Sequence, residues 1–343
     1  MKTVYSDRHK LHHPKGELSG GRIVPPFENP SRCAYILDRL AEVGLGEVIE
    51  PESHGRDPLI AVHDPAYVAF LSGAWAEWEA AGHEGEAVPT TWPSRRLDRA
   101  VPPRAILGKL GYYCLSSDVT ITPGTWDAAT AAADVALTGQ ALVAGGERAA
   151  FALCRPPGHH AARDMYGGYC FLNNAAIAAQ AFLGAGARRV AVLDVDFHHG
   201  NGTQEIFYDR PDVLFLSLHG DPDDAFPYFL GAADEQGEGA GEGFNVNYPL
   251  PKGCPFARWA EALEDACGRI KAYEPDALVV SLGVDTYKDD PISFFRLESR
   301  DFLTYGERLK KLDLPTLFVM EGGYAMDEIG INTVNVLEGF ENA

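Results

Sequence analysis

The stretch Val190-Ala-Val-Leu-Asp-Val-Asp-Phe-His-His-Gly-Asn-Gly202 decides the fold. Apolar and small residues run into Asp194, Asp196 and His198, and glycines then break the run. An apolar run that ends at a turn predicts a strand buried on both faces of a parallel sheet. Because side chains alternate along a strand, Asp194, Asp196 and His198 should point the same way, while His199 should face the opposite side in a structural role. Two buried carboxylates and an imidazole at one strand end predict a metal site.

Strands and helices alternate on both sides of this stretch. Such alternation implies βαβ units with right-handed crossovers, and therefore a parallel sheet covered by helices on both faces. No internal repeat, low-complexity tract or linker interrupts the chain, so one domain over residues 1–343 is expected. The expected strands are 3–5, 149–153, 189–196, 213–219, 277–285 and 316–321, and the expected helices are 31–43, 64–82, 125–145, 174–183, 256–273, 299–312 and 328–339.

Composition limits the class of protein. A chain of 343 residues with 46% hydrophobic and 10% aromatic residues can bury a large core. The formal charge of −20 and the pI near 4.9 argue against a nucleic-acid partner, because phosphates would be repelled. The same charge would steer cationic substrates toward the protein, or serve solubility alone, and composition leaves both readings open.

The cysteines and the apolar segments indicate the compartment. The six cysteines form no C-x-x-C pair, which predicts free buried thiols rather than a disulfide framework. The first residues do not resemble a signal peptide, and no apolar stretch approaches the ~18 residues of a transmembrane helix. A soluble, cytoplasmic protein without a membrane partner is therefore expected. The cysteines are residues 33, 114, 154, 170, 254 and 267.

Two early segments fit no regular period. Residues 6–30 hold several histidines, glycines and prolines and are expected to form a loop. His12 and His13 lack a nearby third ligand, so an exposed pair is favoured over a metal site. Residues 83–126 are rich in aromatic residues and proline, and a loop of this length is usually functional. We expect this segment to form a wall of the pocket and a subunit contact.

Four of the expected strands end in polar motifs. In an open α/β sheet, ligands bind outside the carboxyl ends of the strands, so these four endings should converge. Asp196, His198 and Asp285 supply three ligands, which is the number that catalytic zinc typically takes from a protein. Ion pairs or helix caps are the alternative, but no lysine or arginine lies close in these strands. The motifs are Arg155-Pro-Pro-Gly-His-His160, Asp194-Val-Asp-Phe-His198, Val280-Ser-Leu-Gly-Val-Asp285 and Met320-Glu-Gly-Gly-Tyr324.

The histidine pair and the tyrosine add acid–base chemistry to this edge. An imidazole with a pKa of ~6.5 can take a proton from water and return it to a leaving amine, a role open to His159 or His160. The phenol of Tyr324 can donate a hydrogen bond to a polarised carbonyl or an oxyanion. A metal, a general base and an oxyanion donor together predict the hydrolysis of a carbonyl compound, with an amide favoured.

These motifs, together with Ser217-Leu-His219, resemble those of the histone deacetylase superfamily. The whole chain, including Gly111-Tyr-Tyr-Cys114, Pro123-Gly-Thr-Trp126 and Asp289-Asp-Pro-Ile-Ser-Phe-Phe295, looks most like its bacterial acetylpolyamine amidohydrolase branch. The resemblance implies a three-layer arginase–deacetylase fold, an α/β architecture with a central, mostly eight-stranded parallel sheet and helices on both faces. It also implies a homodimer in which the segment 83–126 narrows the entrance to the partner's site.

The resemblance implies one zinc ion held by Asp196, His198 and Asp285, a ligand set that also accepts iron. The family's arginase relatives bridge two manganese ions with extra carboxylates, whereas this chain has Gly200 and Gly283 at the matching positions. One catalytic metal is therefore expected. A monovalent cation, usually potassium, is implied at an oxygen-rich cluster that suits a hard ion. Its ligands would be Asp194, Ser217 and main-chain carbonyls near Asp196, His198 and Leu218.

The same resemblance assigns the reacting groups and the substrate site. His159 and His160 would flank the water, with His160 favoured as general base and general acid, and Tyr324 would polarise the acetyl carbonyl. Asn201 stands where other members carry Asp, so the partner of His160 is expected to be neutral. The residues expected to line the substrate tunnel or its mouth are Tyr169, Phe226, Gly168, Ile292 and Asp118.

Two departures from the branch concern the substrate. Asp118 stands where the branch tends to have glutamate, which keeps the charge but shortens the side chain by one methylene group. An exposed loop acid is the alternative reading of Asp118. Where a further acid would be expected, this chain has Leu107 and Lys109. Recognition of a distal ammonium group would therefore be weaker or differently spaced.

The prediction is a zinc-dependent amidohydrolase that converts N-acetylated polyamines or related acetylated alkylamines to free amine and acetate. One alternative is a deacetylase acting on acetyl-lysine in proteins or on another small amide. A second alternative is a non-catalytic sensor of acetylated amines, which the complete hydrolytic set of residues disfavours.

Overall fold

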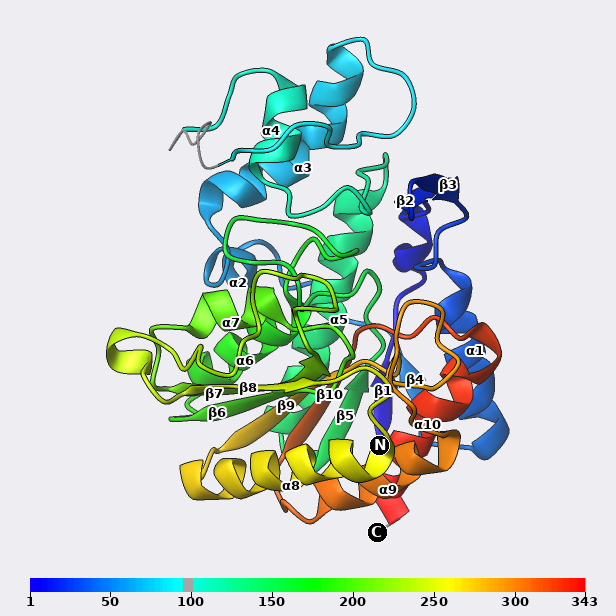
Figure 1. Ribbon diagram of the computed structural model, residues 1–343, viewed down its shortest axis with the longest axis vertical. Helices are drawn as coiled ribbons and strands as arrows, with labels where there is room; N and C mark the ends of the chain where they lie inside the picture. Colours follow the sequence, from blue (N-terminus) through cyan, green and yellow to red (C-terminus); the bar gives the residue numbers. More distant parts are fainter. Residues whose placement is uncertain (95–100, 343) are drawn as a thin grey trace.

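The computed structural model describes residues 1–94 and 101–342, and its centre is an eight-stranded sheet. All neighbouring strands pair in parallel, and helices cover both faces, which confirms the predicted fold class (Figure 1). Across the sheet the order is β4 (Val48–Ile49), β1 (Lys2–Val4), β5 (Ala149–Ala152), β10 (Thr316–Met320), β9 (Ala277–Leu282), β6 (Val190–Asp194), β7 (Val213–Gly220) and β8 (Asn245–Leu250).

Alternate side chains of the strands enter two separate cores. In β6, Val190 and Val192 belong to one core, whereas Ala191 and Leu193 belong to the other. Helices α8, α9 and α10 lie below the sheet in Figure 1, and α5, α6 and α7 lie above it. The helices are α1 (Ser31–Val43), α2 (Asp57–Ile60), α3 (Pro65–Ala80), α4 (Ile106–Tyr112), α5 (Thr125–Ala144), α6 (Asn174–Gly184), α7 (Asn201–Phe207), α8 (Phe256–Tyr273), α9 (Ser299–Lys310) and α10 (Met326–Asn342), with 3₁₀ turns η1 (Asp7–Leu11) and η2 (Gly239–Gly241).

The strand β6 ends earlier than its sequence predicts. The strand stops at Asp194 rather than at Asp196, but the expected alternation continues, because Val195 and Phe197 enter the same core as Ala191 and Leu193. Beyond it, the Asp196 N–H donates to Asp194 Oδ1 at 3.1 Å, and the His198 N–H donates to Asp196 Oδ1 at 2.8 Å. Such bonds from main chain to side chain compete with sheet pairing, and the segment bends after the strand ends. Asp194, Asp196 and His198 therefore stay on the side opposite to Val195 and Phe197, as the alternation predicted.

Residues 6–30 contain regular structure that the sequence reading missed. Glu17–Ser19 (β2) and Arg22–Val24 (β3) form an antiparallel hairpin, where a loop was expected. Gly20 and Gly21 have φ of 54° and 77°, which favours the primed turns that suit tight hairpins. The Gly-Gly pair between two short apolar segments was the available signal. Figure 1 shows the hairpin near the end of the molecule that also holds α3 and α4.

His12 departs from the expectation of an exposed histidine pair. Only 2% of its surface is accessible, and its Nδ1 lies 3.0 Å from Thr125 Oγ1 at the start of α5. His13 is exposed, as expected. The 3₁₀ turn η1 carries the chain inward before His12. The sequence of this segment has neither helical nor strand periodicity, so the turn was not predicted.

Two other expectations can be compared with the described residues. All six cysteines are buried and free, as predicted. Within the described ranges, no helix combines the length and apolar character needed to cross a membrane. The segment 83–126 contains α4, and its residues 95–100 lie outside the described residues.

Candidate active site and metal centre

The four polar motifs meet because the four strands that precede them are neighbours. The sheet places β5, β10, β9 and β6 side by side, although their positions in the chain differ by more than 160 residues. All four strands are parallel, so their carboxyl ends lie at one edge. This edge is where open α/β sheets bind ligands.

Asp196, His198 and Asp285 form a compact group that could hold a metal ion. One ligand atom from each lies within 4.8 Å of the others, and all three residues are buried. His198 Nδ1 is 3.3 Å from Asp196 Oδ1 and 3.0 Å from Asp285 Oδ2. Among the described residues, the ion pairs of both carboxylates involve only histidines. Two buried carboxylates and an imidazole, without a lysine or arginine partner, fit a divalent cation.

Glycines leave room for the carboxylates of this group. A Cβ atom added at Gly283 would come within 2.0 Å of Asp196 Oδ2, and one at Gly322 within 2.5 Å of the same oxygen. At Gly200, a Cβ would come within 2.2 Å of Asp194 Oδ2. Neither Gly200 nor Gly283 can therefore be replaced by a further ligand without rearrangement.

The histidines at the end of the β5 motif have different partners. His159 Nδ1 is 3.0 Å from Asp194 Oδ2, whereas His160 Nδ1 is 2.7 Å from Asn201 Oδ1. The partner of His160 is neutral, as the sequence predicted. An amide oxygen only accepts hydrogen bonds, so His160 carries its hydrogen on Nδ1 and keeps Nε2 as the free base.

Electrostatics separates the two imidazoles further. Burial lowers the pKa of His159, but the nearby carboxylates of Asp196 and Asp194 outweigh burial and raise it well above 6.5. Burial also lowers the pKa of His160, and the neighbouring rings of His159 and His198 lower it further. The two pKa values are thus shifted in opposite directions, as a general base and an electrostatic partner require.

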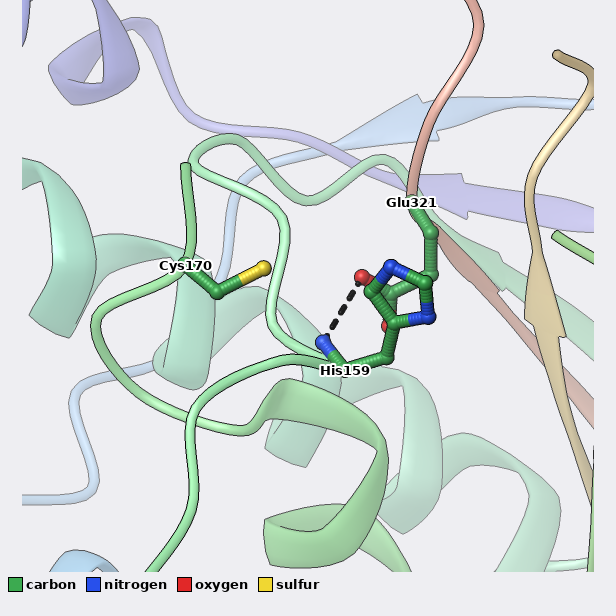
Figure 2. A group of neighbouring side chains, drawn as sticks. All are labelled: His159, Cys170 and Glu321. Carbon is green, nitrogen blue, oxygen red and sulfur yellow. Dashed lines mark hydrogen bonds between the residues drawn. The ribbon is translucent and has the colours of Figure 1, made fainter. Parts of the chain in front are cut away.

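A second group of possible metal ligands adjoins the first, since His159 Nε2 lies 3.8 Å from Asp196 Oδ1. His159, Cys170 and Glu321 also have ligand atoms within 4.8 Å of one another. Figure 2 shows the Glu321 carboxylate against the main chain of His159, where it accepts the N–H of Gly158 at 2.6 Å and that of His159 at 3.1 Å. The Cys170 thiol lies 3.3 Å from the Gly168 carbonyl. Through these contacts, the group holds the main chain of the histidine motif in place.

A cavity of about 310 Å³ opens onto His160, His198 and Tyr324. The Phe226 ring stands edge-on to His160 with centroids 5.0 Å apart, and the Tyr169 ring stands edge-on to Tyr324 at 5.7 Å. Aromatic rings thus border the cavity near the reacting groups. All five residues expected in the substrate site line it, namely Asp118, Gly168, Tyr169, Phe226 and Ile292.

Sequence reasoning missed an acidic residue of the cavity wall. Glu17 lines the cavity from the β2–β3 hairpin, with Oε1 accepting the Tyr169 hydroxyl at 2.9 Å. Its Oε2 accepts the Phe27 N–H at 3.1 Å. The charge was visible in the sequence, but the hairpin that carries it inward was not predicted. Asp118, which bonds Ser116, lines the same cavity and is not a free surface acid.

The other expected acidic position has no carboxylate. Leu107 is 44% exposed, and Lys109 is paired with Glu77, its Nζ lying 2.8 Å from both carboxylate oxygens. Two of the residues expected to bind a monovalent cation are neighbours in the sheet. Asp194 and Ser217 are register partners on β6 and β7, and both are fully buried.

His199 faces away from the metal group. Its Nε2 lies 3.0 Å from Gln204 Oε1 and 3.2 Å from Asn247 Oδ1, and the residue is fully buried. This network holds α7 against β8, which agrees with the structural role expected from its position in the motif.

Comparisons with known proteins point to one family. The family model described as histone deacetylase domain matches residues 26–340. Acetylpolyamine amidohydrolase 1 of Pseudomonas aeruginosa is 62% identical over 344 residues, covering 100% of this chain and 99% of its own. The acetylpolyamine amidohydrolase of Mycoplana ramosa is 53% identical over 339 residues, with 99% of each chain covered.

A solved structure gives the same result. The crystal structure of acetylpolyamine aminohydrolase from Burkholderia pseudomallei matches with a TM-score of 0.94 at 42% identity. The match covers 99% of this chain and 98% of that one. Fold, sequence and the geometry of the sheet edge therefore agree, and the chain belongs to the histone deacetylase family.

Proposed function

We propose that this protein is a metal-dependent deacetylase that hydrolyses N-acetylated polyamines or related acetylated alkylamines to free amine and acetate. The observation that carries the substrate class is the charge of the cavity. Glu17, Asp118 and Asp224 line it, the last paired with Lys252, and no lysine or arginine itself lines the cavity among the described residues. A cationic alkylamine is the complement of a narrow aromatic cavity with acidic walls. The relatives named acetylpolyamine amidohydrolases support this choice.

We propose zinc as the metal, held by Asp196, His198 and Asp285, with iron as the alternative. A bound zinc ion would supply a Lewis acid that polarises a carbonyl and makes water more acidic. The donor set supports this assignment, since its three buried ligand atoms lie together beside the cavity.

The chain's own residues would handle the protons and the charge of the reaction. His160 accepts the proton of the attacking water at Nε2, because Nδ1 is committed to Asn201. Tyr324 donates a hydrogen bond to the acetyl oxygen as negative charge develops there. His160 then delivers its proton to the amine nitrogen when the C–N bond breaks. The rings of Tyr169 and Phe226 exclude water from the alkyl chain.

We propose potassium as a second, structural cation at Asp194 and Ser217. Two neighbouring buried oxygen donors at a strand end favour a hard monovalent ion. We further propose that the chain is one domain and that the segment 83–126 serves as a contact between two copies. Asp118 from this segment lines the cavity, so a second copy there would also alter the entrance.

A kinetic panel tests the proposed substrate. We expect kcat/KM to be highest for acetylated putrescine, cadaverine or spermidine, and lower for an acetyl-lysine peptide and for N-butylacetamide, which lacks the distal charge. If the acetyl-lysine peptide were the best substrate, the protein would be a protein deacetylase. Equal kcat/KM values for N-butylacetamide and acetylputrescine would show that the acidic wall does not select the substrate.

A further inference from the structure

Asp290 is a buried carboxylate that lies outside both groups of candidate metal ligands. Only 6% of its surface is accessible. Its Oδ2 accepts the main-chain N–H of Tyr324 at 2.7 Å and that of Ala325 at 3.2 Å. Its Oδ1 accepts the main-chain N–H of Ile292 at 3.1 Å. The carboxylate thus joins two segments of the chain that are 32 residues apart at Ile292 and Tyr324.

Both segments reach the cavity. Tyr324 follows β10 and presents its ring there, while Ile292 and Phe294 form part of the wall. Burying a carboxylate is costly, and hydrogen bonds from main-chain N–H groups offset that cost. Because one carboxyl group bonds both segments, a movement of Asp290 relative to either would break a hydrogen bond to the main chain. Its geometry therefore couples the tyrosine to the wall.

The opposite side of the tyrosine turn is held by a cation. Arg32 Nε donates to the Gly323 carbonyl at 2.8 Å, and its guanidinium also donates to the Glu321 carbonyl. The guanidinium carbon lies 5.0 Å from the centroid of the Tyr324 ring. Gly323 has a φ of 132°, which only glycine adopts readily, so the turn is tight. Arg32 binds carbonyl groups of this turn, and Asp290 binds N–H groups of the same turn. Together they restrict its movement.

We propose that Asp290 is a positioning residue that fixes the Tyr324 hydroxyl relative to the substrate wall. It touches neither substrate nor metal and acts through the main chain of the tyrosine. This inference rests on the proposed function, in which Tyr324 donates a hydrogen bond to the acetyl oxygen. A misplacement of a reacting group by about 1 Å can lower the rate roughly 100-fold. Small shifts of the tyrosine turn should therefore lower the rate.

The first test is the variant Asp290→Asn, assayed with the best acetylated amine from the panel. The amide has one acceptor oxygen, and its NH₂ group would face a main-chain N–H. We expect kcat to fall roughly 10-fold or more, with a smaller change in KM. Asp289→Asn is the matched control, because the neighbouring Asp289 is exposed, and it should keep wild-type kcat.

The decisive test is a double-mutant cycle with Tyr324→Phe, which removes the hydroxyl. If Asp290 acts through that hydroxyl, Asp290→Asn should lower kcat less than about twofold in the Tyr324→Phe background. The same fold-loss in both backgrounds would mean a merely structural role and would overturn the inference. So would wild-type kcat in Asp290→Asn.

Folding and function are kept apart in this design. Circular dichroism and thermal melting give the folded fraction, and if Asp290→Asn does not fold, Asp290→Glu enters the same cycle because it keeps the carboxylate. A wild-type protein that hydrolyses none of the acetylated amines would overturn the proposed function. Hydrolysis by the wild type together with an additive cycle would overturn only the role of Asp290.

Discussion

The base and the rim of the cavity are built in different ways. The base comes from four turns that follow β5, β10, β9 and β6, and its ionisable side chains are almost completely buried. The rim comes from the β2–β3 hairpin, the residues around Asp118 and the loop 221–232. In that loop Tyr228 is 56% exposed and Phe229 is 87% exposed. The sheet therefore determines the position of the base, whereas irregular segments and a small hairpin form the rim.

The two regions also differ in how their charges are balanced. In the base, Asp194 and Asp285 each have a histidine within 3.0 Å, and Glu321 accepts two main-chain N–H groups. In the rim, Glu17 is bonded by a phenol and one N–H, so no cation offsets its charge there among the described contacts. We infer that the base is arranged for a fixed metal and the rim for a substrate that brings its own positive charge.

The largest expected effect concerns the base. Asp285→Ala should lose the bound metal and lower kcat/KM roughly 1,000-fold or more, because a metal contributes several kcal/mol of transition-state stabilisation. Elemental analysis of dialysed protein measures the metal, and acetate release measures the rate. Chelator-treated wild-type protein should lose activity and regain it with zinc.

Cys170→Ala is the matched control for this prediction. Cys170 is equally buried but belongs to the second group of candidate ligands. The control should keep the metal content of the wild type. Metal retained by Asp285→Ala but lost from Cys170→Ala would move the metal centre to the second group.

The contrast between base and rim also explains what the sequence could predict. The motifs at Arg155–His160 and Asp194–His198 follow apolar strands, and parallel strands must end at one edge, so their convergence followed from general rules. The end of the strand was harder to predict, because the hydrogen bonds from main chain to carboxylates that follow Asp194 depend on geometry that a strand pattern does not encode. The alternation placed the right residues on one side, and only the length of the strand was overestimated.

Prediction failed where position depends on tertiary packing. Glu17 enters the cavity because a hairpin folds over it, and the hairpin has only three residues in each strand. His12 is buried against α5 although its neighbours in sequence, Leu11 and His13, are exposed. Asp290 was visible as part of a motif, but its bonds to the main chain of Tyr324 required the fold. Short elements and contacts distant in sequence carry weak local signals.

The second prediction concerns the stability of the base. Glu28 is 1% exposed, and its Oε1 accepts Arg155 Nε at 2.7 Å and Arg32 Nη1 at 3.0 Å. This carboxylate therefore joins the arginine before the histidine motif to the arginine that holds the tyrosine turn. Glu28→Gln should lower the free energy of unfolding at pH 7 by about 3–5 kcal/mol, because it leaves two buried cations without their partner. Urea denaturation measures the loss.

The effect of Glu28 should depend on pH. Burial raises its pKa, but Arg155 and Arg32 outweigh burial and lower it from 4.5 to about 2. Its stabilisation is thus complete above pH 4.5 and is lost as the pH falls toward 2. Burial and Arg155 also lower the pKa of His9 to about 4 and that of His12 to about 3. The charge of Glu28 opposes both of these shifts, so in the wild type it also lessens the acid destabilisation by His9 and His12.

The difference between wild type and Glu28→Gln should therefore shrink across that acid range. A difference that stayed constant with pH would contradict the assignment to the charge of Glu28. Glu42→Gln is the control, because Glu42 pairs with Arg39 at the surface with 68% of its side chain exposed. That change should cost less than about 1 kcal/mol.

The smallest expected effect concerns the rim. Glu17→Gln should raise KM for acetylputrescine about 10-fold at pH 8, since an ion pair in a partly buried site contributes on the order of 1–2 kcal/mol. KM for N-butylacetamide, which has the same alkyl length and no charge, should stay within about twofold. Asp118→Asn should act in the same direction, because Asp118 lines the same cavity.

The pH dependence sharpens this last prediction. Burial raises the pKa of Glu17 to about 7, with Asp118 and Glu28 adding to the rise and the hydroxyl of Tyr169 opposing it. Its carboxylate therefore gains charge as the pH rises through about 7, while a distal amine with a pKa near ~10 stays cationic. The KM ratio of acetylputrescine to N-butylacetamide should fall between about pH 6 and 8 in the wild type and stay flat in Glu17→Gln. Because the ratio cancels the titration of His160, a wild-type ratio that did not change would show that the rim selects by shape and not by charge.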